Sequence, residues 1–108
     1  MNITDADRST IIAWALGRPE VRTVYLYGSR ARGDNNADSD IDLAIRLFPG
    51  AGDSSTLATW IFWKVEWDET PDLMLSHPVH LEWYEEDQDL EYVGKGVERD
   101  GIILFTRD

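Results

Sequence analysis

Two short apolar runs, residues 21–27 and 41–47, enclose a loop that is rich in glycine and aspartate. Both runs carry β-branched or aromatic residues, and the second alternates apolar with polar side chains, so each is predicted to form a strand. The first strand stops at Gly28, and Asp40 stands at the start of the second. The loop must therefore join two strands while carrying a high density of negative charge, which restricts the fold more than any other feature.

Capping residues and apolar periodicity predict helices around these strands. Thr4 and Asp7 form a capping arrangement for a helix over residues 5–16, which Gly17 and Pro19 end. The later predicted elements are a helix through Leu57, Ile61 and Val65, a strand over residues 79–84, a helix near residues 88–99 that contains two glycines, and a strand over residues 102–105. This order predicts an α+β fold in a single domain that spans residues 1–108.

The composition excludes several classes of protein. The chain has 108 residues, 43% of them apolar, and no cysteine. No apolar run reaches the roughly 18 residues that a membrane-spanning helix needs. A globular domain without disulfides or thiolate metal sites is predicted, and because the N-terminus lacks the pattern of a signal peptide, we expect a cytoplasmic protein.

Negative charge is concentrated in the second half of the chain. Residues 1–54 hold eight acidic and six basic side chains, whereas residues 55–108 hold thirteen and four, and the net charge is −11. Such a surface repels a nucleic-acid backbone, so no direct, stable nucleic-acid binding is expected unless metal ions bridge the phosphates. A basic protein partner would suit the surface, although a solvated acidic surface also serves solubility alone.

The loop combines the groups that bind a nucleotide with its metal. Gly28 offers backbone N–H groups without a Cβ in the way, and the Ser29 hydroxyl lies beside them, which suits close approach of a phosphate. Asp40 and Asp42 flank Ile41, so the period of two sends both carboxylates to one face of the strand. Close carboxylates repel unless a cation lies between them, and Mg²⁺ is bound through one or two carboxylates together with substrate phosphates. These residues predict a nucleoside triphosphate site with magnesium.

Two other interpretations of the loop stay open. Oxygen-bearing side chains stand at alternate positions from residue 34 to residue 42, as the ligands of a calcium loop do. Ser39 occupies the position that such a loop reserves for glycine, and Ile45 the position of its bidentate glutamate, so calcium is disfavoured. The second alternative is an acidic turn without any ligand.

The order Gly28-Ser29-Arg30-x-x-Gly33 followed by Ser39-Asp40-x-Asp42-Leu43 resembles the signature of the polymerase-β-type nucleotidyltransferase superfamily. The length is similar to that of its minimal members, and GVERDGIILF, residues 96–105, resembles their closing helix and strand. The resemblance implies a polymerase-β-like nucleotidyltransferase fold, a small mixed β-sheet covered by helices.

The resemblance also implies roles for single residues. Gly28, Ser29, Arg30 and Ser39 would bind the nucleotide, and Asp40 and Asp42 would be catalytic carboxylates that bind a two-metal site of Mg²⁺, with Mn²⁺ as the alternative ion and ATP as substrate. The Arg30 guanidinium would neutralise the triphosphate, whereas Arg32 has the equal alternative of pairing with Asp34 or Asp38 in the loop.

A third carboxylate, on a later strand, completes the site in that superfamily. The period of two places His80, Glu82 and Tyr84 on one face of the strand over residues 79–84. Glu82 is the candidate for both catalysis and metal binding, although the superfamily usually has aspartate here. Asp72 is its rival in a loop between two prolines. His80 is expected to be an incidental solvent-facing residue, with binding of a phosphate or orientation of Glu82 as the alternatives.

The activity that the resemblance implies is metal-dependent transfer of a nucleoside monophosphate, AMP from ATP, to a hydroxyl acceptor. Because 108 residues leave no room for a second, substrate-binding domain, another molecule is expected to present that acceptor. Minimal nucleotidyltransferases of this kind act as antitoxins that transfer AMP to a tyrosine of a helical HEPN ribonuclease toxin. The alternatives are a non-catalytic partner-binding module with the same fold and a small-molecule, aminoglycoside-type nucleotidyltransferase whose acceptor site spans a homodimer.

Overall fold

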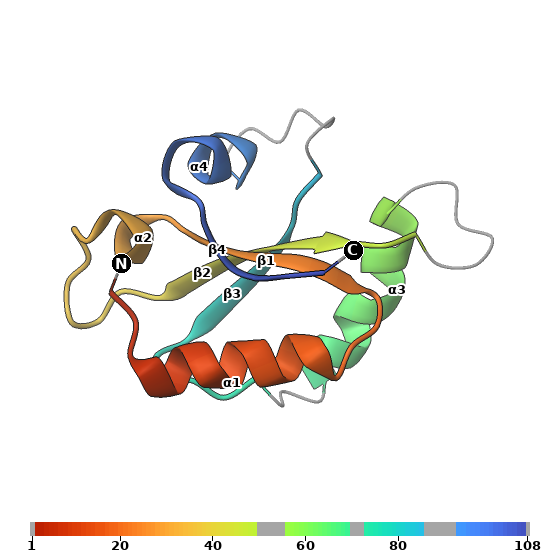
Figure 1. The fold of residues 1–108 in the computed structure, drawn as a ribbon, viewed down its shortest axis with the longest axis horizontal. Coiled ribbons are helices and arrows are strands. Elements are labelled where there is room, and N and C mark those ends of the chain that lie inside the picture. The colour runs from red at the N-terminus through yellow and green to blue at the C-terminus, as the bar shows by residue number, and fades with distance from the viewer. Residues whose placement is uncertain (1, 50–55, 70–72, 86–92, 108) are drawn as a thin grey trace.

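The computed structural model describes residues 2–49, 56–69, 73–85 and 93–107. Helices and strands alternate along the chain, with a short helix between the first two strands (Figure 1). The elements are α1 (Asp5–Leu16), β1 (Val21–Tyr27), α2 (Ser29–Arg32), β2 (Ile41–Leu47), α3 (Thr56–Glu69), β3 (Val79–Trp83), α4 (Val93–Asp100) and β4 (Ile102–Thr106). None of the described helices is long and apolar enough to cross a membrane.

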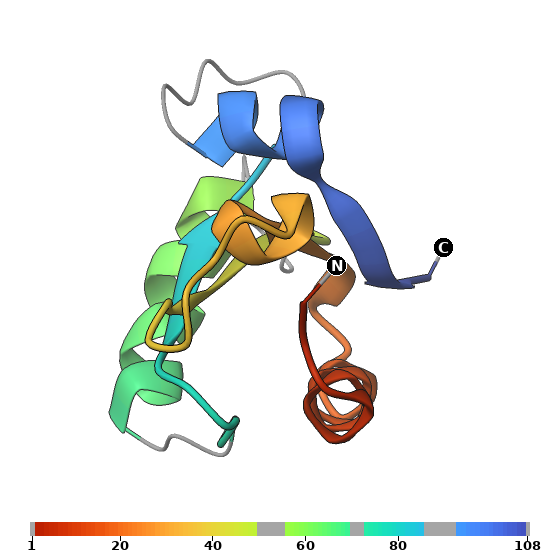
Figure 2. The same cartoon turned by 90° about the vertical axis from the view of Figure 1, so that its left-hand side faces the viewer.

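The four strands form one mixed sheet in the order β3-β2-β1-β4. β1 runs antiparallel to both β2 and β4, whereas β2 and β3 are parallel and are joined by a crossover that contains α3. The predicted small mixed sheet covered by helices is therefore confirmed. Figure 2 shows α1 on the side of the sheet opposite to α4, so both faces are covered.

The larger core fills the space between the sheet and the pair α1 and α3. Alternate residues of β2, among them Leu43 and Ile45, face this core because successive side chains of a strand point to opposite faces. Trp14 of α1 and Trp60 of α3 each pack edge-to-face on Trp67, with ring centroids 5.3 and 5.7 Å apart. This core fixes the position of β2, the strand that carries Asp42.

The helix predicted near residues 88–99 is observed as α4, from Val93 to Asp100, and residues 86–92 lie outside the described part of the chain. Gly96 of this helix packs on the second face of the sheet. A Cβ added at Gly96 would lie 2.9 Å from Cδ2 of Tyr27, closer than carbon atoms approach without displacement. Glycine therefore lets α4 lie directly on the Tyr27 ring.

Replacing Gly96 with alanine is expected to lower the free energy of unfolding by about 1–2 kcal/mol, because the clash with Tyr27 outweighs the gain in helix propensity. Chemical denaturation of the variant measures this difference. Lys95→Ala is the matched control, since Lys95 is exposed on the same helix and the substitution removes no packing. Equal or greater stability of the Gly96 variant would show that α4 is not held against Tyr27.

Candidate active site

Gly28 ends β1 in a backbone conformation, φ 77° and ψ −155°, that is essentially restricted to glycine. A Cβ at this position would lie 2.7 Å from Oδ2 of Asp42. The backbone of Gly28 thus lies directly against a carboxylate of the neighbouring strand. Ser29 begins α2 immediately afterwards.

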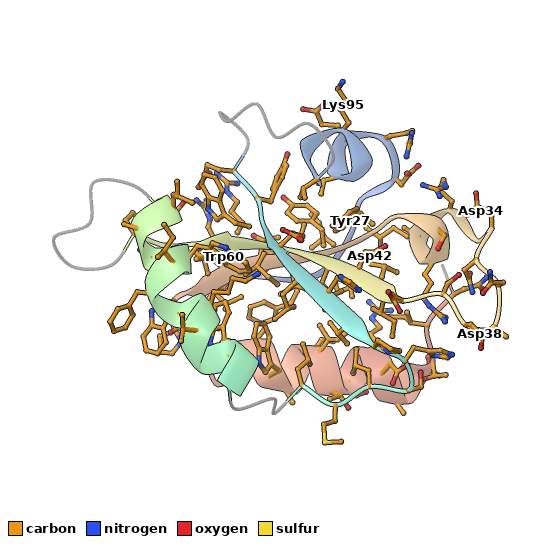
Figure 3. The ribbon with its side chains drawn as sticks, turned by 180° about the vertical axis from the view of Figure 1, so that it is seen from behind. Tyr27, Asp34, Asp38, Asp42, Trp60 and Lys95 are labelled. Carbon is orange, nitrogen blue, oxygen red and sulfur yellow. The ribbon has the colours of Figure 1, made fainter. Side chains whose placement is uncertain are left out.

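Three carboxylates lie on the face of the sheet that α4 covers. Asp42 pairs with Tyr27 on β1 and with His80 on β3, and Glu82 stands opposite Ala44, two residues further along β2. Asp40 precedes β2 by one residue and shares the face of Asp42 through the period of two. Figure 3 shows Asp42 beside Tyr27 on this face, with Asp34 and Asp38 at the outer edge of the loop.

The electrostatics of Asp42 show that these groups act on one another. Burial raises the pKa of Asp42 above its ordinary value, and the charges of Asp40 and Glu82 raise it further, against an opposing effect of His80. The charged form of Asp42 is therefore less favourable here than that of a free carboxyl group. A positive charge bound between Asp40 and Asp42 would remove this penalty.

The donor set fits a hard divalent cation in part. Asp40 and Asp42 supply the one or two carboxylates through which Mg²⁺ is commonly held beside substrate phosphates. Within the described residues no group of three or more histidine, cysteine, aspartate or glutamate side chains stands close enough to hold an ion on its own. The structure therefore provides a two-carboxylate site that substrate oxygens would have to complete.

His80 has a partner in the site that the sequence did not indicate. Its Nε2 donates a hydrogen bond to Oδ2 of Asp40 over 2.8 Å. The contact arises because the parallel register places His80 directly beside Asp42, and this register cannot be read from the spacing of residues. His80, with 56% of its side chain exposed, thus lies against a carboxylate of the site.

The structure corrects the interpretation of Arg30 as a triphosphate ligand. Its side chain is 93% buried, with 7% of its surface exposed, and donates from Nε and Nη2 to the carbonyl oxygen of Ser39 and from Nη1 to that of Asn2. All three nitrogens of this guanidinium donate to backbone carbonyls, so the group serves the fold of the loop. Arg30 instead ties the N-terminal segment and the start of β2 to α2.

The remaining loop residues are held by one another. The hydroxyl of Ser39 accepts from the backbone N–H of Asn36 and closes a turn, so it serves the loop conformation. Arg32 pairs with Asp34 and with Asp100 of α4, which agrees with its predicted loop pairing through Asp34. The rival third carboxylate, Asp72, lies outside the described residues.

Tyr27 is a site residue that the sequence analysis missed. Burial, and then the charges of Asp42 and Glu82, raise the pKa of Tyr27 to about 12. The phenol therefore remains protonated at neutral pH and can donate a hydrogen bond on the carboxylate face. Its position as the last residue of β1, just before Gly28, was the available signal.

Solved structures share the fold of this chain. A solved toxin–antitoxin structure with AMP-PNP is 21% identical, with a TM-score of 0.56 over 93% of this chain and 73% of that one. A mutant of the toxin–antitoxin MntA-HpeT is 19% identical, with the same TM-score and coverage. At these identities the likeness establishes the fold alone.

No curated protein matches the chain. The family model described as "Polymerase beta, Nucleotidyltransferase" matches residues 9–108. This match contains Gly28, Asp42, Glu82 and the closing strand β4, and it confirms the resemblance carried by the two motifs. The chain belongs to the polymerase beta nucleotidyltransferase family.

Proposed function

We propose that the protein transfers a nucleoside monophosphate, AMP from ATP, to a hydroxyl acceptor and releases pyrophosphate. The observation that carries this proposal is the contact of the Gly28 backbone with the carboxylate of Asp42. A phosphate bound at Gly28 would meet the oxygen atoms of Asp40 and Asp42 within one small volume. Mg²⁺ held by these two aspartates would neutralise the triphosphate and the leaving pyrophosphate.

The residues of the chain would act from different sides of the triphosphate. Gly28 and Ser29 offer N–H groups and a hydroxyl to the phosphates. Glu82 is exposed on β3 and can take the proton of the acceptor hydroxyl at its carboxylate. The acceptor oxygen then bonds to the α-phosphorus while the bond from that phosphorus to the bridging oxygen of pyrophosphate breaks.

The acceptor that we propose is a tyrosine of a partner toxin, a helical HEPN ribonuclease that the protein neutralises as its antitoxin. Two observations support a partner of this kind: the two similar structures are toxin–antitoxin assemblies, and the acidic second half of this chain suits a basic surface. The location would then be the cytoplasm, where ATP, Mg²⁺ and the toxin meet.

The test is a transfer assay with the purified toxin partner, ATP and Mg²⁺, read by intact-mass spectrometry of the partner. The expected result is a mass gain of one AMP, mapped to a tyrosine by fragmentation. An Asp40→Asn, Asp42→Asn double variant is the control and should leave the partner unmodified. A stable complex in which the wild type adds no AMP to the partner would refute the proposed enzymatic activity.

One observation favours a second candidate, a module that binds its partner by contact alone. The outer face of α3 exposes four apolar side chains, Leu57, Ile61, Phe62 and Val65. They follow the helical spacing, so they form one stripe next to the buried side that carries Trp60. An exposed apolar stripe of this kind is typical of a protein–protein interface.

Phe62→Ser is expected to weaken the partner complex by about 30-fold, which is the effect of removing an aromatic anchor from an interface. The side chain is 71% exposed, so folding stability should change by no more than about 0.5 kcal/mol. Biolayer interferometry with the partner measures the affinity. The control is Leu16→Ser on α1, also at an exposed apolar residue, which should leave the affinity for the partner unchanged. An unchanged affinity of the Phe62→Ser variant would show that α3 is not the interface.

A further inference from the structure

A chain of hydrogen bonds connects α1 with the motif loop, which we define as residues 33–39 between α2 and β2. The carboxylate of Asp7 accepts from both the backbone N–H and the hydroxyl of Ser76. The same Ser76 oxygen lies 3.0 Å from Nδ1 of His77. On the other side of the imidazole ring, Nε2 lies 2.6 Å from the carbonyl oxygen of Ala37 in the motif loop.

The donors and acceptors in this chain fix the protonation of His77. Hydrogen bonds from Ser76 and Thr4 outweigh the effect of burial and hold the pKa of Asp7 below its ordinary value, so Asp7 is an ionised acceptor. The single hydroxyl hydrogen of Ser76 is therefore directed to Asp7. Nδ1 must then donate to the Ser76 oxygen, and Nε2 must donate to the Ala37 carbonyl, which has no hydrogen to give.

Both ring nitrogens donate only in the imidazolium form. A neutral ring would place a lone pair against either the Ala37 carbonyl or the Ser76 oxygen, and one hydrogen bond of the chain would be lost. The charge is compatible with its surroundings, since the positive charge of His77 also acts on Asp7 and lowers the pKa of that carboxyl group.

The charged groups around His77 come from three segments. Asp7 of α1 is 94% buried, and the guanidinium of Arg30 lines the same hollow of about 270 Å³ as His77. Asp38 follows Ala37 in the motif loop and is exposed. Two carboxylates and one guanidinium are therefore the charged groups near the ring. The buried carboxylate of Asp7 is connected to the ring through the hydroxyl of Ser76.

The motif loop leads directly into the carboxylate pair. Ala37 is three residues before Asp40, and the intervening Ser39 is the residue whose carbonyl oxygen holds Arg30. His77 thus contacts the carbonyl of Ala37, and Arg30 contacts the carbonyl of Ser39, two residues further along the loop. Only the contact of His77 involves a group that can lose its proton. Loss of the His77 contact leaves the segment before Asp40 attached at Ser39.

We propose that His77 is a positioning residue that holds the motif loop, and through it Asp40, in the nucleotide-binding arrangement only in its imidazolium form. This inference rests on the proposed function of the same site. Nucleotide affinity should then fall when the ring loses one of its two protons. Loss of one charge-assisted hydrogen bond should reduce the affinity by about three- to tenfold.

The first experiment needs no nucleotide. The chain has two histidines, so a His80→Gln background leaves a single imidazole to follow by ¹H–¹⁵N NMR. We expect both ring nitrogens to carry protons at low pH, and the backbone amides of Asn36, Asp38 and Ser39 to titrate with the same midpoint. His77→Gln in that background should abolish this shared transition. A neutral ring throughout, or loop amides that ignore its titration, would overturn the proposal.

The second experiment measures the affinity of the chain for a non-hydrolysable ATP analogue in the presence of Mg²⁺, over a series of pH values, in the wild type and in His77→Gln. The part of the pH dependence that disappears in His77→Gln, with His80 present in both proteins, belongs to His77. Binding of the analogue with no such difference would refute the positioning role and leave the proposed function intact. If the ring and the loop titrate together but no nucleotide binds, the coupling of His77 to the loop is supported and the proposed function is refuted.

Discussion

Gly28→Ala is expected to abolish metal-dependent nucleotide binding and to lower the free energy of unfolding by about 2–3 kcal/mol, because a non-glycine residue is strained in the backbone region that Gly28 occupies. The added Cβ would also displace the carboxylate of Asp42, since it would lie 2.7 Å from Oδ2. One methyl group would thus disturb the phosphate side and the metal side of the site together. Calorimetric titration and thermal denaturation measure the two effects.

Gly33→Ala is the matched control for this variant. Gly33 also has a positive φ, 86°, but a Cβ there would meet no atom within 4 Å. The control should therefore lose stability through backbone strain of about 1–2 kcal/mol while it keeps most of its nucleotide affinity. Equal loss of affinity in both variants would mean that strain, rather than contact with Asp42, explains the result.

Asp42→Asn is expected to remove nucleotide binding and, at the same time, to stabilise the metal-free protein at neutral pH. The pKa of Asp42 is raised in the folded state by burial and by Asp40 and Glu82. A carboxyl group with a raised pKa favours folding while protonated, and this contribution is lost as the pH rises through its folded pKa. Asparagine carries no charge, so the variant avoids that loss.

Thermal denaturation between about pH 4 and 8 tests the sign, since carboxyl groups titrate at the acid end of this range. The stability advantage of Asp42→Asn should grow as the pH rises from the acid end and should vanish when Mg²⁺ and nucleotide are added to the wild type. Asp38→Asn removes the same charge from an exposed position of the loop and should show neither effect. A variant less stable than the wild type at every pH would refute the electrostatic account of the site.

Local patterns predicted the elements whose causes are local. Thr4 caps α1 through the backbone N–H of Asp7, and the helix covers residues 5–16 as the capping and ending residues indicate. The alternation in residues 41–47 predicted β2 with its bounds. By contrast, α2 has only four residues, too few to show a period, and Gly96 of α4 is explained only by its packing on Tyr27.

In the candidate site, too, local patterns predicted some features, and tertiary contacts determine the others. The period of two placed Asp40 with Asp42 on one strand and His80 with Glu82 on the other, and the parallel register of β2 and β3 puts Asp42 and Glu82 on one face of the sheet. The partners of Asp40 and Arg30 depend on tertiary contacts: the parallel pairing of β2 with β3 brings His80 to Asp40, and the fold of the loop brings the Ser39 carbonyl to Arg30. Sequence spacing contains neither piece of information, so it predicted a phosphate ligand where the structure has a buried anchor.

The most direct test of the central claim is calorimetric titration of the wild-type chain with a non-hydrolysable ATP analogue, with and without Mg²⁺. The account predicts binding that requires Mg²⁺ and that disappears in the Asp40→Asn, Asp42→Asn double variant, with circular dichroism showing both proteins folded. Binding that is equally strong without Mg²⁺, or that survives in the double variant, would contradict a nucleotide site built on these two carboxylates.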